Sequence, residues 1–334
     1  MVREIERAGA THITLPVDSK NPLTVWKNVA RLAEVIRAHD VDIVHARSRA
    51  PAWSARAAAR ATGAHFVTTF HGAYNAQNWF KRKYNAIMAR GERVIAISDY
   101  IHDIVVNQYG APPERVRVIH RGVDLTMFDP HAVSPARIVQ LAKAWSLPDG
   151  IPIVMLPGRL TRWKGQTVLI DALAKLGRSD VRCVLVGADQ GREAYRRELM
   201  DRATRARLGD TVRIVGHCND MPAAYMLADV VVSASTDPEA FGRVAAEAQA
   251  MGRPVIATDH GASRRTVIHG ETGWLVPPGD SAALAEALQH ALGISGRERE
   301  QLAARAIANI HANFTKAAMC EATLAVYREV LAAA

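Results

Sequence analysis

The sequence predicts an α/β protein with two parallel-sheet domains, and three observations lead to this prediction. The chain has 334 residues, which is about twice the length of a typical domain. Short β-branched runs alternate with longer segments of helical period, as they do in βαβ units. A turn-rich segment at 122–135 separates these runs into two groups, each large enough for a sheet of its own.

Each predicted element follows from this alternation. Strands of the first group are expected at 12–16, 42–46, 65–70, 94–97 and 116–120, with helices at 25–39, 52–62 and 76–90. Strands of the second group are expected at 152–156, 183–186, 212–215, 230–234 and 254–257. We therefore expect a Rossmann-like domain over 1–128, a second over 129–314, and a C-terminal helix over 315–334 that packs back on the first domain.

The beginning of the chain departs from the usual order of such a domain. A domain of this kind normally opens with a strand and a ligand-binding turn, whereas this chain opens with a helix-like segment at 3–9. We expect the first domain to lack its opening strand and Gly-rich loop. On this interpretation the native protein begins roughly 50 to 60 residues before Met1, about two βα steps.

Composition narrows the class of protein. Hydrophobic residues make up 49% and charged residues 22%, which excludes a disordered or fibrous chain. No apolar run approaches the length of a membrane span, and the first residues lack the apolar core of a signal peptide. Cys183, Cys218 and Cys320 are isolated, so they predict neither a disulfide framework nor a zinc site. We expect a cytoplasmic protein.

The basic excess is uneven. The whole chain has a net charge of +9, and residues 1–128 hold 18 basic against 11 acidic residues. This asymmetry favours an anionic partner for the first half, either nucleic acid or an acidic membrane surface. A solvated basic face explains it equally well.

A cationic loop follows the first strand of the second half. The strand at 152–156 leads into Gly158, Arg159 and Lys164, and a helix begins directly after Gly165. Parallel sheets bind ligands at the carboxyl ends of their strands. Fixed cations beside a helix start suit a diphosphate, although Arg and Lys are also common on ordinary surface loops.

A second element spans 235–248, where a helix is expected to start near Gly242. The N–H groups of that first turn would face an anion at the positive end of the helix dipole. Glu239 precedes the helix and Glu247 lies about 7 Å along it, so the two carboxylates can bind hydroxyls on different parts of one elongated ligand.

These features together resemble a known family, the retaining, nucleotide-sugar-dependent glycosyltransferases of family 4, also called glycosyl transferases group 1. They are Arg159, Lys164, the spacing of Glu239 and Glu247, and the stretches 252–258 (GRPVIAT) and 270–276 (GETGWLV). The resemblance covers roughly 40–334 and is most specific over 157–277. It implies a GT-B fold, in which two Rossmann-like domains face each other across a cleft.

The resemblance also implies a donor site. Arg159 and Lys164 would bind the donor diphosphate, Glu247 the ribose hydroxyls and Glu239 the transferred sugar. The remaining donor-binding residues are Gly158, the N–H groups of Phe241, Gly242, Arg243 and Val244, and Gly216, His217 and Cys218 near the base. The donor would be a UDP- or GDP-linked sugar, which is a co-substrate, and no cofactor is expected.

In the first half, His71 directly follows the predicted strand at 65–70. A lone His at a strand end is more often a surface or capping residue. The resemblance implies contact with the donor sugar, so we predict that His71 is catalytic together with Arg159, Lys164 and Glu239. Arg47 and Ser98, each after a strand, are expected on the acceptor side.

The expected chemistry depends on stabilising the leaving group. Negative charge develops on the diphosphate as the sugar bond breaks, and the predicted cations and helix start would stabilise it. We expect no metal ion in the site, because the predicted cations would stabilise the diphosphate charge in its place. The resemblance also implies front-face attack by the acceptor hydroxyl, without a covalent enzyme intermediate.

Aromatic residues adjoin three consecutive cations between His71 and Arg90. They are Trp79, Phe80, Lys81, Arg82 and Lys83. Rings and cations on one helix suit an anionic headgroup layer, so we expect peripheral contact with the inner face of the cytoplasmic membrane. The same composition suits nucleic acid, or a partly buried helix with a basic rim.

The function predicted is therefore a hexosyltransferase that extends a glycan or lipid-linked acceptor in cell-surface polysaccharide or lipopolysaccharide synthesis, with no nucleic acid as partner. One alternative is another GT-B enzyme, such as a sugar-nucleotide epimerase or a phosphorylase. Another is a non-catalytic protein that binds a nucleotide sugar or nucleic acid.

Overall fold

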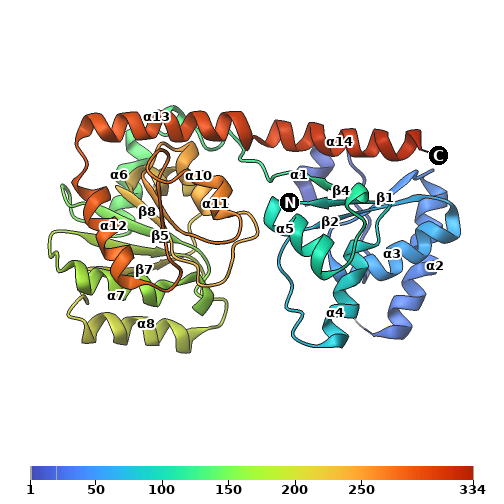
Figure 1. Cartoon of the computed structure of the whole chain (residues 1–334), viewed down its shortest axis with the longest axis horizontal. Helices are drawn as coiled ribbons and strands as arrows, with labels where there is room; N and C mark the ends of the chain where they lie inside the picture. Colours follow the sequence, from blue (N-terminus) through green and yellow to red (C-terminus); the bar gives the residue numbers. More distant parts are fainter. Residues whose placement is uncertain (1, 20, 334) are drawn as a thin grey trace. The chain divides into compact units, whose positions relative to one another are not determined.

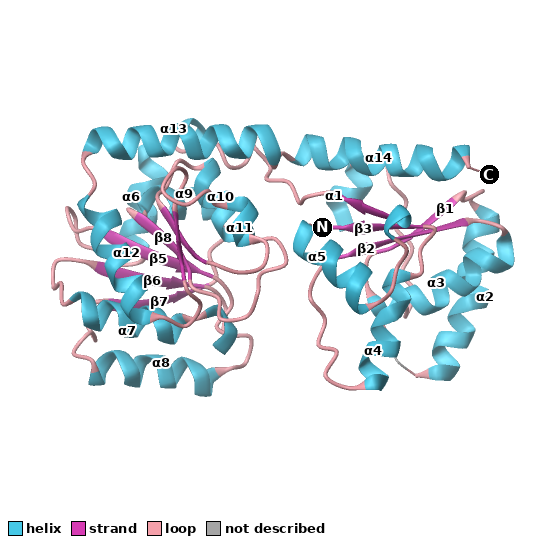
Figure 2. Cartoon of the chain, in the orientation of Figure 1, coloured by secondary structure: helices cyan, strands magenta, loops and turns pink. Residues whose placement is uncertain are grey.

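The computed structural model describes residues 2–19 and 21–333, and the chain divides into two compact units. Unit 1 comprises the residues up to Ile119 together with those from Ala322 onward, and unit 2 comprises His120–Glu321. The division therefore falls before the turn-rich segment at 122–135, and the C-terminal helix contributes residues to both units. Each unit has one parallel sheet flanked by helices (Figures 1 and 2).

Unit 1 has four parallel strands in the order β1-β2-β3-β4. The strands are β1 (Ile43–Ala46), β2 (His65–Phe70), β3 (Arg93–Ala96) and β4 (Val116–Val118), which confirms four of the five predicted strands. β2 is buried over almost its whole length, as expected for an inner strand of a parallel sheet. The helices are α1 (Val2–Arg7), α2 (Pro22–Ala38), α3 (Arg49–Thr62), α4 (Trp79–Asn85) and α5 (Asp99–Asp103), with short turns η1 (Ala86–Ala89), η2 (Ile104–Gln108) and η3 (Pro113–Arg115).

The predicted strand at 12–16 is wrong. Residues 11–16 have no regular secondary structure, and Ile13 is 43% exposed. The alternating pattern favours an extended chain, but a strand also needs a neighbour that pairs with its backbone. No strand in the described part of the chain pairs with this segment, whose end is instead held by a hydrogen bond from Asn28 Nδ2 to Pro16 O at 2.8 Å.

The helix predicted at 76–90 is shorter than expected. α4 starts only at Trp79 because Asn78 caps it, with Oδ1 accepting the Lys81 N–H at 2.8 Å. The helix then tightens into the 3-10 turn η1. The buried Asn85 at this junction donates from Nδ2 to Asn75 O at 3.0 Å, so the segment before α4 is a loop anchored by this side chain.

Unit 2 has six parallel strands in the order β10-β9-β8-β5-β6-β7. The strands are β5 (Ile153–Pro157), β6 (Arg182–Val186), β7 (Val212–Gly216), β8 (Val230–Ser233), β9 (Val255–Thr258) and β10 (Trp274–Val276). The first five confirm the predicted strands, whereas β10 was not predicted. The helices are α6 (Pro135–Ala144), α7 (Gln166–Leu176), α8 (Glu193–Arg205), α9 (Met221–Leu227), α10 (Arg243–Ala250), α11 (Ser263–Thr266), α12 (Ser281–Gly293) and α13 (Gly296–Asn313), with turns η4 (Pro130–Ala132) and η5 (Arg162–Lys164).

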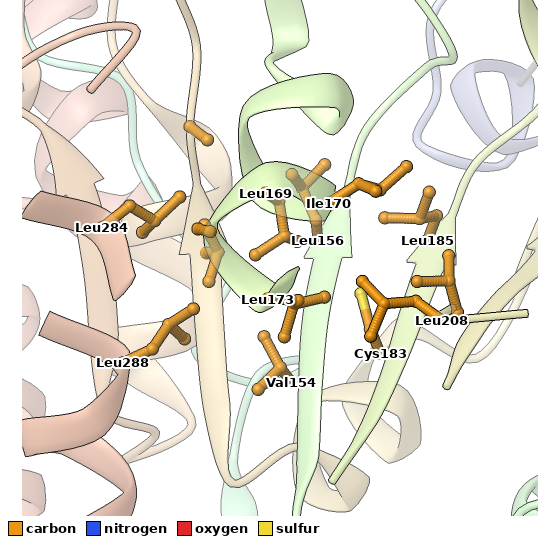
Figure 3. Close-up of a cluster of buried hydrophobic side chains, with 14 of the residues drawn as sticks. Val154, Leu156, Leu169, Ile170, Leu173, Cys183, Leu185, Leu208, Leu284 and Leu288 are labelled. Atoms are coloured by element: carbon orange, nitrogen blue, oxygen red, sulfur yellow. The ribbon is translucent and has the colours of Figure 1, made fainter. Parts of the chain in front are cut away.

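A continuous apolar core fills one face of the unit 2 sheet. Leu169, Ile170 and Leu173 of α7 lie on β5 and β6, and Leu284 and Leu288 of α12 pack beside them (Figure 3). All five side chains are at most 1% exposed. Burial of a Leu or Ile side chain contributes about 1.5 to 3 kcal/mol, so this face holds the sheet and its strand ends in place.

The last helix, α14 (Lys316–Ala332), contributes its later residues to unit 1. There the Tyr327 hydroxyl lies 2.5 Å from His45 Nδ1, and the other ring nitrogen of His45 lies 2.6 Å from Thr69 Oγ1. Glu329 accepts from Arg93 Nε at 2.8 Å and also from Arg117, and the two guanidinium groups lower the pKa of its carboxyl. The helix is thus fixed to β1, β3 and β4 by polar contacts.

We predict that acid loosens this packing of α14 within unit 1. Burial, with a smaller effect of Arg47, lowers the pKa of His45 from 6.5 to about 4. The unfolded chain therefore binds the His45 proton more readily than the folded chain does. The contribution of neutral His45 to the free energy of unfolding is fully present above pH 6.5 and is lost as the pH falls toward 4, with about 2 kcal/mol lost by pH 5.

Hydrogen exchange of residues 322–332 at pH 7.5 and pH 5, corrected for intrinsic rates, measures this effect. His45→Gln keeps a donor and an acceptor but has no titration, so its protection should change less between the two pH values. Equal acid sensitivity in the variant and the wild type would contradict the prediction.

Candidate functional site

Three loops of unit 2 follow neighbouring strands at the carboxyl edge of the sheet. The chain order reverses between β5 and β8, and open parallel sheets bind ligands at such a switch point. The loop after β5 spans 158–165, the loop after β8 spans 234–242, and the loop after β9 spans 259–262. The structure therefore brings together the two segments that the sequence singled out.

The loop after β5 is shaped by close backbone packing. A Cβ on Gly187, in the loop after β6, would lie 2.0 Å from Gly158 O. Gly158 N donates to Val186 O at 2.8 Å, and Leu160 is buried beneath the loop. Arg159 is exposed, and its side chain has no hydrogen bond or ion pair in the described part of the chain. It is therefore available to an anionic ligand.

The loops after β5 and β8 meet at Gly165. This residue has φ +71°, and a Cβ there would lie 1.8 Å from Ala234 O, so only glycine fits. Next to this contact Thr236 N donates to Trp163 O at 2.7 Å. The two loops are therefore tied together by their backbones.

Lys164 and Glu239 form an ion pair across these loops. Lys164 Nζ donates to Glu239 Oε1 at 2.5 Å, and their side chains are only 15% and 12% exposed. Ser235, which is buried, donates from Oγ to the same carboxylate oxygen at 2.6 Å. The Trp163 ring lies 4.3 Å from the ammonium group. A cation and a carboxylate predicted to bind different parts of a ligand thus bind each other here.

The loop after β9 supports Glu239 from its backbone side. Ala262 N donates to Glu239 O at 2.9 Å. A Cβ on Gly261, whose φ is +56°, would lie 2.6 Å from the same oxygen. Ser235 lies in the predicted element at 235–248, but no role was predicted for it or for this loop, because a local pattern gives no sign of contacts between separate strand ends.

α10 begins at the same edge of the sheet. Gly242, with φ +80°, occupies the position before the helix, and no side chain caps the first turn. The N–H groups that start α10 are therefore without an intrahelical acceptor, as in anion sites at helix starts. Phe241 is buried, while Val244 is half-buried and Arg243 is exposed.

Glu247, one turn into α10, is only 8% exposed and both its oxygens are occupied. Tyr225 donates from its hydroxyl to Oε2 at 2.9 Å, and Arg243 donates from Nη2 to Oε1 at 2.7 Å. Sequence reasoning did not single out Tyr225, because a tyrosine on a short helix gives no signal of its own.

The segment predicted to meet the base follows β7. Gly216 has φ +75°, and its carbonyl accepts the Gly187 N–H at 2.7 Å, which links this strand end to the loop after β6. His217 is exposed, whereas Cys218 is 9% exposed and burial raises the pKa of its thiol. Of the three residues, His217 has the most accessible side chain.

In unit 1 the ends of β1 and β2 bring two predicted residues together. Arg47 Nε lies 3.4 Å from His71 Nε2, and Arg47 is exposed. Ser98 has a different environment, because it is 1% exposed and its hydroxyl accepts the Ile101 N–H at 3.2 Å. Ser98 caps α5. This structural role explains a serine at this position without any contact to an acceptor substrate.

The aromatic and basic segment at 79–83 lies on the surface of unit 1. Trp79 and Phe80 are 63% and 76% exposed. Lys81 is exposed, and Lys83 Nζ lies 4.9 Å from the centre of the Trp79 ring. Arg82 is partly committed, since its guanidinium donates to Gln108 O at 2.6 Å. Two large rings and the side chains of Lys81 and Lys83 therefore face solvent.

Neither a metal-binding cluster nor a membrane-spanning helix is found among the described residues. No group of three or more His, Cys, Asp and Glu side chains there could hold a metal ion, and no helix there is long and apolar enough to span a membrane. The sequence has one Asp-x-Asp, Asp40-Val41-Asp42, which precedes β1. It lies at the amino end of the sheet, away from the strand ends where His71 lies.

Comparison with known proteins agrees with this geometry. The family model described as Glycosyl transferases group 1 matches residues 140–309, and that described as Glycosyltransferase Family 4 matches residues 3–127. The chain belongs to the glycosyl transferases group 1. The predicted family is thereby confirmed, and each match falls mainly within one of the two units.

Solved structures confirm the predicted GT-B fold. A glycosyltransferase from Rickettsia africae is 36% identical with a TM-score of 0.92, over 99% of this chain and 87% of that chain. Anabaena HepE in complex with UDP-glucose is 27% identical with a TM-score of 0.85, over 98% and 88%.

Curated relatives of this group 1 chain include the D-inositol 3-phosphate glycosyltransferase of Xylanimonas cellulosilytica. It is 37% identical over 225 residues, which are 64% of this chain and 53% of the relative. A relative of the same name from Catenulispora acidiphila is 34% identical over 74% of this chain and 59% of its own length. The chain spans about half the length of the curated relatives it matches.

We predict that Gly165→Ala destabilises unit 2 more than Gly177→Ala does. Both glycines have φ near +70°, so each alanine costs about 1 to 2 kcal/mol of backbone strain. At Gly177 a Cβ would meet only Lys175 O at 4.0 Å, whereas at Gly165 it would overlap Ala234 O. Urea unfolding of the two variants compares the costs, and equal losses would show that the loops after β5 and β8 separate easily.

Proposed function

We propose that the chain is a retaining glycosyltransferase that moves a hexose from a UDP- or GDP-linked sugar to an acceptor hydroxyl. The observation behind this proposal is the arrangement at the switch point of unit 2. Lys164, Arg159 and the uncapped start of α10 form a cationic site for a diphosphate, with two carboxylates beside it. Support also comes from HepE, whose structure is described in complex with UDP-glucose.

Donor binding would exchange partners within this site. A diphosphate offers Lys164 stronger and more numerous acceptors than the carboxylate of Glu239. Once Lys164 turns to the diphosphate, hydroxyls of the transferred sugar can take its place at the Glu239 carboxylate. Ser235 keeps the carboxylate in place during this exchange, because its own hydrogen bond to Glu239 does not involve the ligand.

The same groups would supply the chemistry. As the bond between the sugar and the phosphate breaks, its electron pair goes to the diphosphate oxygen, and Lys164, Arg159 and the α10 N–H groups stabilise that charge. The acceptor hydroxyl bonds to the anomeric carbon on the same face and gives its proton to the departing diphosphate oxygen, without a covalent enzyme intermediate. His71 is proposed to contact the donor sugar.

The acceptor would bind to unit 1. Arg47 beside His71, and the basic excess of residues 1–128, favour an acceptor that contains phosphate. A lipid-linked or glycan acceptor in cell-surface polysaccharide or lipopolysaccharide synthesis is the first candidate, and the exposed segment at 79–83 supports it. The names of the curated relatives supply a second candidate, D-inositol 3-phosphate.

The full-length chain incubated with UDP- and GDP-sugars tests the proposal, with released nucleotide as the readout. Addition of D-inositol 3-phosphate or of a polyprenyl-diphosphate glycan then distinguishes the two acceptor candidates. Conversion of the donor without any acceptor would indicate an epimerase, and no turnover of any donor would leave only a binding protein.

We predict that Lys164→Ala and Glu247→Ala each weaken donor binding or turnover at least about tenfold. Each removes a charged hydrogen bond, for which about 1.5 to 3 kcal/mol is expected. Arg162→Ala is the matched control, because Arg162 lies in the same loop but its guanidinium binds Glu198. Calorimetric titration with UDP and GDP measures the effect, and full activity in both variants would refute the donor site.

We predict that chelation leaves the reaction rate unchanged. The diphosphate charge would be stabilised by Lys164, Arg159 and the α10 N–H groups, so no divalent ion is required. Rates are compared before and after EDTA, and after Mn²⁺ or Mg²⁺ is added back. A sharp loss in EDTA that either ion restores would contradict this account of the leaving group.

We predict that replacing Lys81, Arg82 and Lys83 by Ser reduces sedimentation with anionic liposomes. Each cation near such a surface contributes on the order of 1 kcal/mol. Serine at Arg197, Arg205 and Arg207 of unit 2 makes the same change in charge elsewhere and serves as the control. Equal binding by the two triple variants would mean that the segment is only a basic rim.

A further inference from the structure

The two oxygens of the Glu247 carboxylate have partners of opposite character. Oε2 accepts from the Tyr225 hydroxyl, and Tyr225 is completely buried. Oε1 accepts from Arg243, whose side chain is 66% exposed and lies one turn earlier on α10. A ligand that replaces a partner of this carboxylate therefore meets two very unequal ones.

Tyr225 is held by the protein independently of any ligand. Its ring packs against Phe128 with the two ring centres 6.0 Å apart. Its helix, α9, is capped by Asp220, which accepts the Ala223 N–H at 3.1 Å and is itself held by Arg137 at 2.9 and 2.6 Å. Burial and the neighbouring Glu247 raise the pKa of Tyr225 well above 10, so the hydroxyl remains a donor at any working pH.

Arg243, by contrast, is easily displaced. Its guanidinium is exposed, so when a ligand takes Oε1 the guanidinium turns to water and no buried donor is left without a partner. A vicinal diol that approaches α10 can thus take Oε1 from Arg243 at little cost. Removing Tyr225 from Oε2 would leave a buried hydroxyl without a partner, which is far more costly.

We propose that Tyr225 is a positioning residue for ribose recognition: it holds Glu247 by Oε2 so that Oε1 is presented to the vicinal hydroxyls of the nucleotide. This inference rests on the proposed function, in which Glu247 binds the ribose. It adds that the site selects ribonucleotides through a buried tyrosine that never touches them. Arg243 covers the carboxylate in the absence of ligand and is not required for recognition by its side chain.

The experiment is a cycle of protein and ligand changes on the full chain. UDP and 2′,3′-dideoxy-UDP are titrated against the wild type, Tyr225→Phe, Glu247→Gln and Arg243→Met. We expect Tyr225→Phe to raise the Kd of UDP about tenfold while changing that of the dideoxy nucleotide less than about twofold. Arg243→Met keeps the backbone N–H but removes the guanidinium that competes for Oε1, so it should lower the Kd of UDP.

Phenylalanine keeps the ring in the core, so the variant is expected to fold, and the dideoxy nucleotide controls for general loosening of unit 2. Tyr109→Phe removes a hydroxyl from unit 1, where it accepts from Asn85, and should bind both nucleotides as the wild type does.

Two outcomes would overturn this inference and leave the proposed function standing. In the first, Tyr225→Phe weakens the binding of both nucleotides equally. In the second, it weakens the binding of neither, while Glu247→Gln weakens that of UDP. Unchanged UDP binding in Glu247→Gln would overturn the ribose assignment and, with it, the inference. If the wild type does not bind UDP, the same titrations are made with GDP and its dideoxy analogue. If it binds neither nucleotide, the proposed function is overturned as well.

Discussion

The site of unit 2 depends on residue 165 being a glycine, which has no side chain. Because Gly165 has no Cβ, the loop after β5 approaches the backbone of Ala234 at the end of β8. That approach allows Thr236 to bond to Trp163 and brings Lys164 within 2.5 Å of Glu239. Any larger residue would separate the two strand ends and, with them, the cation from the carboxylate.

Two cations of the site are paired with carboxylates before any ligand arrives. Lys164 is compensated by Glu239 and Arg243 by Glu247, while Arg159 has no compensating carboxylate among the described residues. Burial of an uncompensated ammonium group would be costly, so the carboxylate partner stabilises the empty site. The same partner competes with an incoming anion, which moderates affinity and makes release of a charged product easier.

Periodicity predicted most of the scaffold, because hydrophobic patterns report burial along one segment. It predicted β2 to the residue, and it failed at 12–16, where an extended segment lacks a neighbour to pair with. Motif resemblance supplied the residue types of the site, such as Lys164 and Glu247. The partners of these residues were beyond prediction, since Tyr225 reaches Glu247 from another helix and no local pattern records such a contact.

The sheet order also has a consequence for the order of assembly during folding. Lys164 and Glu239 are 75 positions apart, and β6, β7 and β8 lie between them in the chain. The site is a product of long-range closure, and contacts of this separation form slowly and late. A ligand that bridges the two loops stabilises only chains whose sheet is already complete. Partly folded chains gain nothing from it, so ligand protection against proteolysis would report the finished sheet and no earlier state.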